Sequence, residues 1–204
     1  PSPDNPTGVI ISRECIEKIL SNIPETTLFI LDEAYFQFVP KEKYWHSIDL
    51  IEKYPNFIIT RTFSKLFGLA GLRIGYGICS EEISKIYEKM RMPFNISLLA
   101  MEAAKTAIKD KEYYSKILKK IITDRENLKI KLKKIGFGIL EESFGNFVFL
   151  QGPKELDTKL IQKGIVIRNL KSFGYEDTFY RITIGTTKQN KILFENIKSI
   201  MGVS

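Results

Sequence analysis

The stretch that decides the fold is Asn56–Gly77, NFIITRTFSKLFGLAGLRIGYG. Its apolar, β-branched start, Phe57–Ile59, predicts a short buried strand. A hydroxyl-rich turn, Thr60–Ser64, leads into Lys65, and Arg73 precedes a second strand-like run. A lysine amine can form an imine with a carbonyl group, and hydroxyls together with an arginine can hold a phosphate. The stretch therefore predicts a lysine that anchors a cofactor beside the end of a strand.

The composition excludes several classes of protein. The chain has 204 residues, of which 44% are hydrophobic, enough for a substantial core and for one or two domains. We expect no membrane span, because no run of about 18 apolar residues occurs, and we expect no signal peptide at the start. Cys15 and Cys79 are far apart, and His46 is the single histidine. We therefore expect neither a disulfide framework nor a metal site, and a cytoplasmic location fits.

The formal net charge of +7 comes largely from lysines in segments with helical periodicity, such as Lys116–Lys120 and Lys129–Lys134. Solvated faces of amphipathic helices are the first interpretation. Attraction of anionic small molecules is the second. Nucleic-acid binding comes third, because no nucleic-acid motif accompanies the charge, and we expect no nucleic-acid partner.

The first part of the chain predicts alternating helices and strands. Ser12 is a candidate N-cap for a helix over Glu14–Leu20. The continuous apolar run Thr27–Leu31 is typical of a parallel strand buried on both faces, and Asp32 stands at its carboxyl end. A long helical pattern starts at Ile96 and is broken near residues 110–111, and a second long helix is expected from Tyr113 to Ile135.

The last part of the chain predicts a smaller sheet-and-helix domain. Strands are expected at Phe147–Leu150, Ile165–Arg168 and Tyr180–Ile184. A short helix is expected between the first two, and Thr187 is the predicted cap of a last helix. The sequence therefore predicts an α/β protein with a first domain over residues 1–112 and a second over residues 113–204.

The candidate site residues are ordinary when taken singly. Asp32 could be a cap, Tyr35 a packed aromatic, Asn5 a turn residue, and Lys65 a surface lysine. Together they match the needs of a pyridine-aldehyde cofactor, which requires a lysine, a carboxylate at its ring nitrogen, donors to its phenolic oxygen and a phosphate cup. The residues that would supply these four needs, in that order, are Lys65, Asp32, Asn5 with Tyr35, and Thr62 with Ser64 and Arg73.

The motifs that carry these residues resemble the fold-type I pyridoxal-phosphate-dependent aminotransferases. They are Asn5–Gly8, Asp32–Tyr35, Ser64–Lys65 and Gly68–Gly75. Within that superfamily the chain is most similar to the histidinol-phosphate aminotransferases. That likeness extends over essentially the whole chain through the segments Phe29–Tyr35, Met92–Asn95, Gly145–Phe147, Gly164–Arg168 and Tyr180–Gly185. Ser97 stands where an asparagine is common in this group.

The resemblance implies a cofactor, pyridoxal 5'-phosphate, and a role for each residue. Lys65 would bond the cofactor aldehyde and be the catalytic residue, and Asp32 would pair with the pyridine nitrogen. The phenolic oxygen would be held by Asn5 and Tyr35, and the cofactor phosphate by Thr62, Ser64 and Arg73. Arg181 would bind the carboxylate of the substrate, Arg168 its phosphate, and Asn146 would lie in the substrate pocket. Planar, bidentate recognition of anions is a physical reason for arginine at both positions.

The resemblance also implies a fold, an activity and partners. The fold would be the C-terminal part of the large, mixed-sheet cofactor-binding domain followed by an α+β small domain. The complete enzyme would be a homodimer that moves an amino group between L-histidinol phosphate and 2-oxoglutarate in histidine biosynthesis. Members of the family are longer than this chain. We therefore expect missing sheet strands, exposed apolar surface and negligible activity of the chain alone.

Three alternatives stay open at this point. The chain could belong to a pyridoxal-phosphate-dependent decarboxylase of a phosphorylated amino acid, to an aromatic aminotransferase, or to a non-catalytic fragment that serves only in binding or dimerisation.

Overall fold

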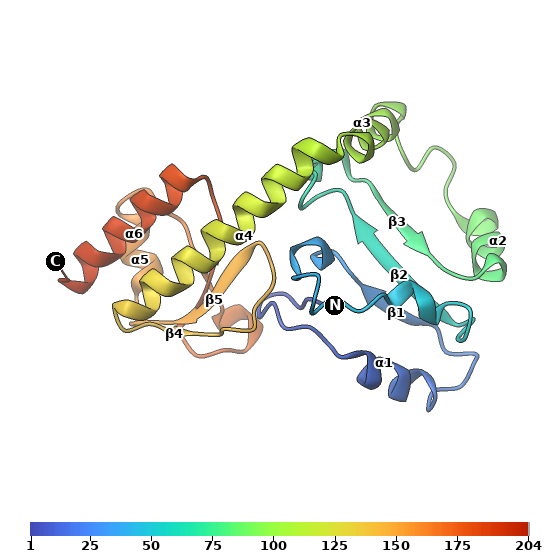
Figure 1. Cartoon of the computed structure of the whole chain (residues 1–204), viewed down its shortest axis with the longest axis horizontal. Helices are drawn as coiled ribbons and strands as arrows, with labels where there is room; N and C mark the ends of the chain where they lie inside the picture. The colour runs from blue at the N-terminus through green and yellow to red at the C-terminus, as the bar shows by residue number, and fades with distance from the viewer. Residues whose placement is uncertain (204) are drawn as a thin grey trace. The chain divides into compact units, whose positions relative to one another are not determined.

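A computed structural model describes residues 1–203, and the chain forms two compact units (Figure 1). The first unit comprises Pro1–Pro3 and Ile10–Lys116. The second comprises Asp4–Val9 and the chain from Ile117 onward. The change from one unit to the other falls inside the long helix α4, Lys111–Lys134.

The first unit is built on a three-stranded sheet in the order β1-β2-β3. Its strands are β1 Phe29–Asp32, β2 Phe57–Thr62 and β3 Gly75–Ile78, its helices α1 Arg13–Leu20, α2 Glu81–Met90 and α3 Leu98–Lys109, and its 3-10 turns η1 Phe36–Phe38, η2 Ser47–Leu50 and η3 Ala70–Leu72. Strands β1 and β2 run parallel, whereas β3 is antiparallel to β2. The carboxyl ends of β1 and β2 therefore lie at the same edge of the sheet, where open α/β sheets bind ligands.

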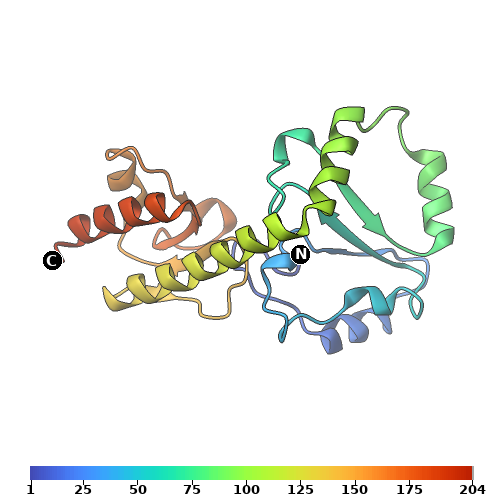
Figure 2. The ribbon, with the colours of Figure 1, turned by 45° about the horizontal axis from the view of Figure 1, so that its top comes forward.

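One face of this sheet carries the core of the unit. Leu31 of β1 and Ile59 of β2 pack with Ile16 and Leu20 of α1, and Figure 2 shows α1 against this side of the strands. Ser12 caps α1 with its side-chain oxygen, as predicted. Both long strands thus place alternate apolar residues against a single amphipathic helix.

The other face of the sheet is open, and the prediction that Thr27–Leu31 is buried on both faces was wrong. Ile30 is 58% exposed. It borders an open cavity of about 1200 Å³ that is also lined by Ile58 of β2, Tyr87 of α2 and Met101 of α3. The physical reason is that α2 and α3 line this cavity instead of packing on the strands.

Strand β2 is longer than expected. Thr60–Thr62, predicted to lie in a turn, continue the strand because they pair with Gly75–Gly77 of β3. This pairing needs a glycine at position 75, since a Cβ there would stand 2.6 Å from the carbonyl oxygen of Arg61. The extra strand residues bring Thr62 to the carboxyl end of β2 and leave the turn to begin at Phe63.

A buried ion pair joins β1 to β2. The Glu33 side chain is 3% exposed and the Arg61 side chain 10%, and Nη2 of Arg61 lies 2.8 Å from Oε2 of Glu33. Ser47 Oγ donates a hydrogen bond of 2.5 Å to Glu33 Oε1, and Tyr44 Oη contacts the same carboxylate. The Arg61 guanidinium also stacks 3.9 Å from the Phe36 ring centroid. Both carboxylate oxygens of Glu33, and Nε and Nη2 of Arg61, thus have partners inside the protein.

The cluster shifts the acidity of two of its members. Burial by itself would lower the pKa of Arg61, but the charge of Glu33 and its hydrogen bonds raise that pKa above its ordinary value. Burial raises the pKa of the Tyr44 hydroxyl, with a further rise from the charge of Glu33. Both shifts keep the guanidinium charged and the phenol neutral.

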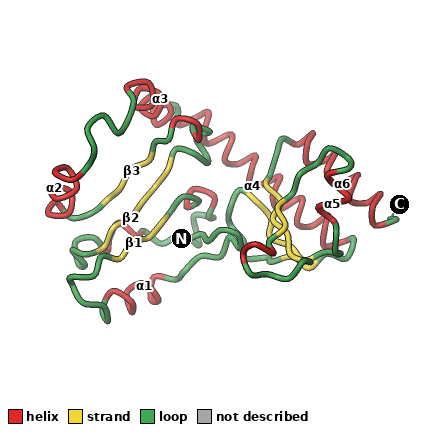
Figure 3. The backbone as a smooth tube through the Cα atoms, turned by 180° about the vertical axis from the view of Figure 1, so that it is seen from behind, coloured by secondary structure: helices red, strands yellow, loops and turns green. Residues whose placement is uncertain are grey.

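The second unit contains a four-stranded antiparallel sheet in the order β4-β5-β7-β6, whose strands Figure 3 shows side by side. Its elements are β4 Gly138–Ile139, β5 Phe147–Gln151, α5 Leu156–Ile161, β6 Arg168–Asn169, the 3-10 turn η4 Lys171–Phe173, β7 Phe179–Thr183 and α6 Thr187–Met201. One buried cluster joins three helices to this sheet. Its members include Leu128 and Leu132 of α4, Val148 and Leu150 of β5, Leu156 and Leu160 of α5, Ile182 of β7, and Leu193 and Ile197 of α6. Helices α4, α5 and α6 thus cover one face of this sheet.

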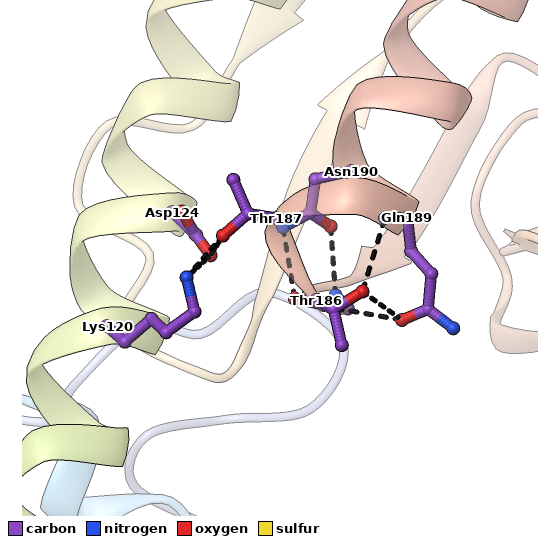
Figure 4. Close-up of polar contacts among 7 residues, drawn as sticks. Lys120, Asp124, Thr186, Thr187, Gln189 and Asn190 are labelled. Carbon is purple, nitrogen blue, oxygen red and sulfur yellow. Dashed lines mark hydrogen bonds and ion pairs between the residues drawn. The ribbon is translucent and has the colours of Figure 1, made fainter.

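Two local predictions for this unit were wrong. Only Arg168 and Asn169 form β6, because Ile165–Ile167 make no ladder with β7. The N-cap of α6 is Thr186, one residue earlier than predicted, and it forms a capping box with Gln189 (Figure 4). The Thr187 hydroxyl instead donates to Asp124 Oδ2 at 3.0 Å.

Within residues 1–203, no helix combines the length and the apolar character that crossing a membrane requires.

We predict that Thr186→Ala lowers the free energy of unfolding by about 1 kcal/mol, because it removes both the cap to Gln189 N and the capping box. Urea denaturation followed by circular dichroism would measure the loss. Ser199→Ala, at an exposed site in the same helix, is the matched control and should change little. Equal stability of the two variants would contradict the prediction.

We predict that Arg61→Met destabilises the first unit by about 3 kcal/mol, because Glu33 then stays buried without its opposite charge. The double variant Glu33→Gln with Arg61→Met should lose less, since no unpaired charge remains. The measurement is a double-mutant cycle from urea denaturation. A double variant less stable than Arg61→Met would show that the pair is not the source of the loss.

Candidate active site

The carboxyl edge of the first sheet presents Asp32. It is the last residue of β1, level with Thr60 of β2 in the parallel register. Its Oδ1 accepts a hydrogen bond of 3.0 Å from Ala34 N, which closes a tight turn after the strand. Glu33 N donates to Thr60 O at 2.8 Å and so continues the ladder for one more residue. The Asp32 carboxylate therefore lies exposed at the sheet edge, on a backbone held from both sides.

Lys65 and Tyr35 come together at this edge from separate loops. The Lys65 Nζ lies 5.1 Å from the centroid of the Tyr35 ring, within the range of a cation–π contact. Tyr35 is only 6% exposed. Within residues 1–203, the Lys65 amine makes this contact with the ring and no hydrogen bond or ion pair.

The turn between β2 and β3 gathers the hydroxyls. Thr62 Oγ1 donates to Ser64 Oγ at 2.9 Å and accepts from Ser64 N at 3.0 Å. Arg73, at the end of the same turn, has a left-handed backbone with φ of 52° and donates from Nη1 to Ala70 O at 2.9 Å. A non-glycine residue in this region is uncommon, and such residues cluster at functional sites.

The turn is held by packing against α3. Phe63 and Ile74, at its two ends, are buried with Ala100 and Ala104 of α3. Phe63 N donates to Ile74 O at 3.2 Å, which ties the two ends together. Ser64 and Arg73 are therefore carried on a turn with a core of its own, and Thr62 ends the strand that leads into it.

A second group of predicted site residues lies in the second unit. The Arg181 guanidinium, on β7, donates from Nη1 to Oδ1 of Asn5. It also stacks 5.3 Å from the centroid of the Phe147 ring. The Arg181 Nε is buried and, within the described part of the chain, has no hydrogen-bond partner. A buried donor without a partner is costly unless a ligand or water supplies one.

Arg168 and Arg181 stand directly opposite each other. They are paired residues of the antiparallel strands β6 and β7, so their side chains leave the same face of the sheet. Two like charges in this position repel, and an anion between them removes the repulsion. Asn146 precedes β5, and its carbonyl accepts from Ile184 N at 2.9 Å, which places it at the end of the same sheet.

The predicted residues thus fall into two sets. Asp32, Tyr35, Thr62, Ser64, Lys65 and Arg73 belong to the first unit, and Asn5, Asn146, Arg168 and Arg181 to the second. The contacts Lys65–Tyr35, Thr62–Ser64 and Arg181–Asn5 join residues within each set.

Sequence reasoning missed the charged residues that support these sets. Glu33 and Arg61 are paired directly beneath the edge that carries Asp32 and Thr62. A signal existed for them, because each charge interrupts an apolar or hydroxyl-bearing run at a strand end. Arg125 and Lys129 lie buried in α4, and their lysine-rich surroundings in the sequence gave no such signal.

Comparison with known proteins identifies the family. Residues 1–197 match the family model for aminotransferase class I and II. The histidinol-phosphate aminotransferase 2 of Archaeoglobus fulgidus is 40% identical over 200 residues, covering 98% of this chain and 56% of that protein. The chain thus spans about half the length of the curated relatives it matches.

Solved structures agree with this match. The histidinol-phosphate aminotransferase from Clostridium acetobutylicum superposes with a TM-score of 0.88 at 30% identity, over 98% of this chain and 62% of that one. The enzyme from Sinorhizobium meliloti, solved in complex with pyridoxal-5'-phosphate, gives 0.85 at 30% identity over 98% and 56%. The resemblance and the fold class predicted from the motifs are confirmed. The chain belongs to the class I and II aminotransferases, a family of enzymes that use pyridoxal 5'-phosphate.

Proposed function

We propose that this chain carries the C-terminal part of an aminotransferase that moves an amino group between L-histidinol phosphate and 2-oxoglutarate. The observation that carries the proposal is Lys65, whose amine rests on the Tyr35 ring beside the strand end that presents Asp32. The relatives named as histidinol-phosphate aminotransferases, at 32–40% identity, support the choice of substrate.

The residues of the first unit fit pyridoxal 5'-phosphate by their chemistry. A free amine, an exposed carboxylate, two hydroxyls and a guanidinium lie on one sheet edge and its adjoining turn. Gly68 gives this turn a left-handed backbone with φ of 67°, which glycine adopts without steric cost. The cofactor, when bound, supplies an electron sink for the carbanion that forms as the substrate loses its α-proton.

The chain's own residues would bind and orient the cofactor and would move the substrate's α-proton. The Asp32 carboxylate would hold the proton on the pyridine nitrogen, which preserves the electron sink. Lys65 Nζ would hold the cofactor at its aldehyde carbon, and its free amine would act as the general base for the substrate's α-proton. The cofactor phosphate would accept hydrogen bonds from Thr62, Ser64 and Arg73.

The second unit would recognise the substrate and the phenolic oxygen. Because Arg181 donates to Asn5 Oδ1, the Asn5 amide nitrogen is left as a donor, and it would donate to the phenolic oxygen. Arg181 would bind the substrate carboxylate, and Arg168, opposite it, would bind the substrate phosphate. Asn146 would lie in the substrate pocket.

We also propose that residues 1–112 correspond to part of the large domain and residues 113–204 to the small domain of a cytoplasmic homodimer. The apolar surface of the first unit supports the view that this chain needs further polypeptide. Phe94 is 98% exposed, Leu99 79% and Met90 78%, and the open sheet face carries Ile30. Exposed apolar surface of this extent is typical of an interface.

We predict that the chain supports amino transfer when its N-terminus is fused to the part of the Archaeoglobus fulgidus relative that it does not match. The fusion should convert histidinol phosphate and 2-oxoglutarate to glutamate and the corresponding carbonyl compound, measured by coupled assay of glutamate. Lys65→Ala should lower kcat by at least about a hundredfold, because the base is lost.

Lys41→Ala, at an exposed lysine of the same unit, is the matched control and should keep full activity. Release of carbon dioxide from a phosphorylated amino acid, without glutamate formation, would show that the activity is decarboxylation and not amino transfer. A folded fusion with neither product would contradict the proposed function.

We predict that the chain by itself binds pyridoxal 5'-phosphate weakly and has negligible turnover, because about half of the relatives' length is not represented in it. The cofactor's visible absorbance on titration, with and without borohydride reduction, reports the bond to Lys65. Tight binding that Lys65→Ala abolishes, together with amino transfer by the chain alone, would contradict this expectation.

A further inference from the structure

Helix α4 buries two positive charges that the proposed chemistry does not use. Arg125 is 1% exposed and Lys129 is 2% exposed. They are four residues apart, so they project from the same face of the helix. Burial lowers the pKa of Lys129, and the neighbouring charge of Arg125 lowers it further. Buried cations at this cost need an explanation, because apolar residues could fill the same space.

Both cations bind the backbone of the loop that leads into β5. Lys129 Nζ donates to Glu141 O at 2.8 Å and to Ser143 O at 3.0 Å, and Arg125 Nη1 donates to Gly145 O at 2.9 Å. Alternate carbonyls of residues 141–145 therefore point at the helix. The Glu126 carboxylate, 2.7 Å from Arg125 Nε and 3.4 Å from Lys129 Nζ, balances part of their charge.

The same loop holds the turn that carries Asn5. Phe144 N donates to Gly8 O at 2.8 Å, and Gly8 N donates to Asp4 O at 2.8 Å. The fit is close, since a Cβ on Gly8 would stand 2.8 Å from Phe144 N. Asn5, inside this turn, accepts the hydrogen bond from Arg181.

We propose that Arg125 and Lys129 are positioning residues that fix the 141–145 loop and, through the Phe144–Gly8 bond, hold Asn5 against Arg181. The inference rests on the proposed function for the meaning of Asn5 and Arg181 as ligand-binding groups. The arrangement explains why cations are buried here. A backbone carbonyl is present at every residue of the loop, and a fixed cation can donate hydrogen bonds to several of them and so orient them together.

The test uses the whole chain and nuclear magnetic resonance without cofactor or substrate. Lys129→Met keeps the length of the side chain and removes its charge. Loss of charged hydrogen bonds should speed hydrogen exchange at Phe144 N–H by about tenfold or more. The resonances of the Asn5 side-chain amide should shift, and exchange in β5 and β7 should stay unchanged.

Lys119→Met, at an exposed lysine of the same helix, is the control and should leave all of these signals unchanged. Arg125→Lys retains the charge and should give a smaller effect than Arg125→Met. Unchanged signals at Phe144 and Asn5 in Lys129→Met would overturn the proposal. So would a uniform rise in exchange across the unit, because it would show a role in stability alone.

If Lys129→Met does not fold, Gly8→Ala tests the next link, since its methyl group separates the turn from the loop without touching α4. The Asn5 signals should then shift while the amide of Gly145 stays as in the parent, and unmoved Asn5 signals would overturn the proposal. Because these measurements contain no ligand, failure of the amino-transfer assay would leave this inference standing, and the reverse also holds.

Discussion

The ion pair between Glu33 and Arg61 joins β1 to β2 immediately beneath the edge that presents Asp32 and Thr62. A carboxylate and a guanidinium that are buried together are stable only when they pair with each other, and few backbone arrangements allow that pairing. The pair therefore ties the two strand ends to one register. This register fixes the positions of Asp32 and Thr62, which are proposed to hold the cofactor.

The second unit also contains buried charges that need partners, but these partners are of a different kind. Its buried cations, Arg125 and Lys129, are matched mainly by backbone carbonyls and by the half-exposed carboxylate of Glu126. A charge paired with carbonyls orients a loop, whereas a charge paired with a carboxylate fixes two side chains. Each unit thus uses buried charge to support a surface that carries candidate ligand-binding groups.

Much of the fold could be predicted because it follows from local patterns. The helix capped by Ser12, the strand that ends at Asp32 and the break between the long helices all appear where periodicity and caps place them. The failures have a physical cause in pairing. Thr60–Thr62 join a strand because β3 returns alongside them, and Ile165–Ile167 leave one because no neighbour pairs with them. The local sequence shows neither that a strand pairs with the first segment nor that none pairs with the second.

The sequence by itself determined the family and the identity of the candidate chemical groups, because lysine, aspartate and arginine at these spacings form motifs of residue type and order. Only the tertiary structure decided which of them touch and what supports them. The contacts Lys65–Tyr35 and Arg181–Asn5 and the opposition of Arg168 to Arg181 join residues distant in the chain. The burial of Arg125 and Lys129 could not be predicted either, because lysines occur around α4 and only its packing against the sheet decides which of them are buried.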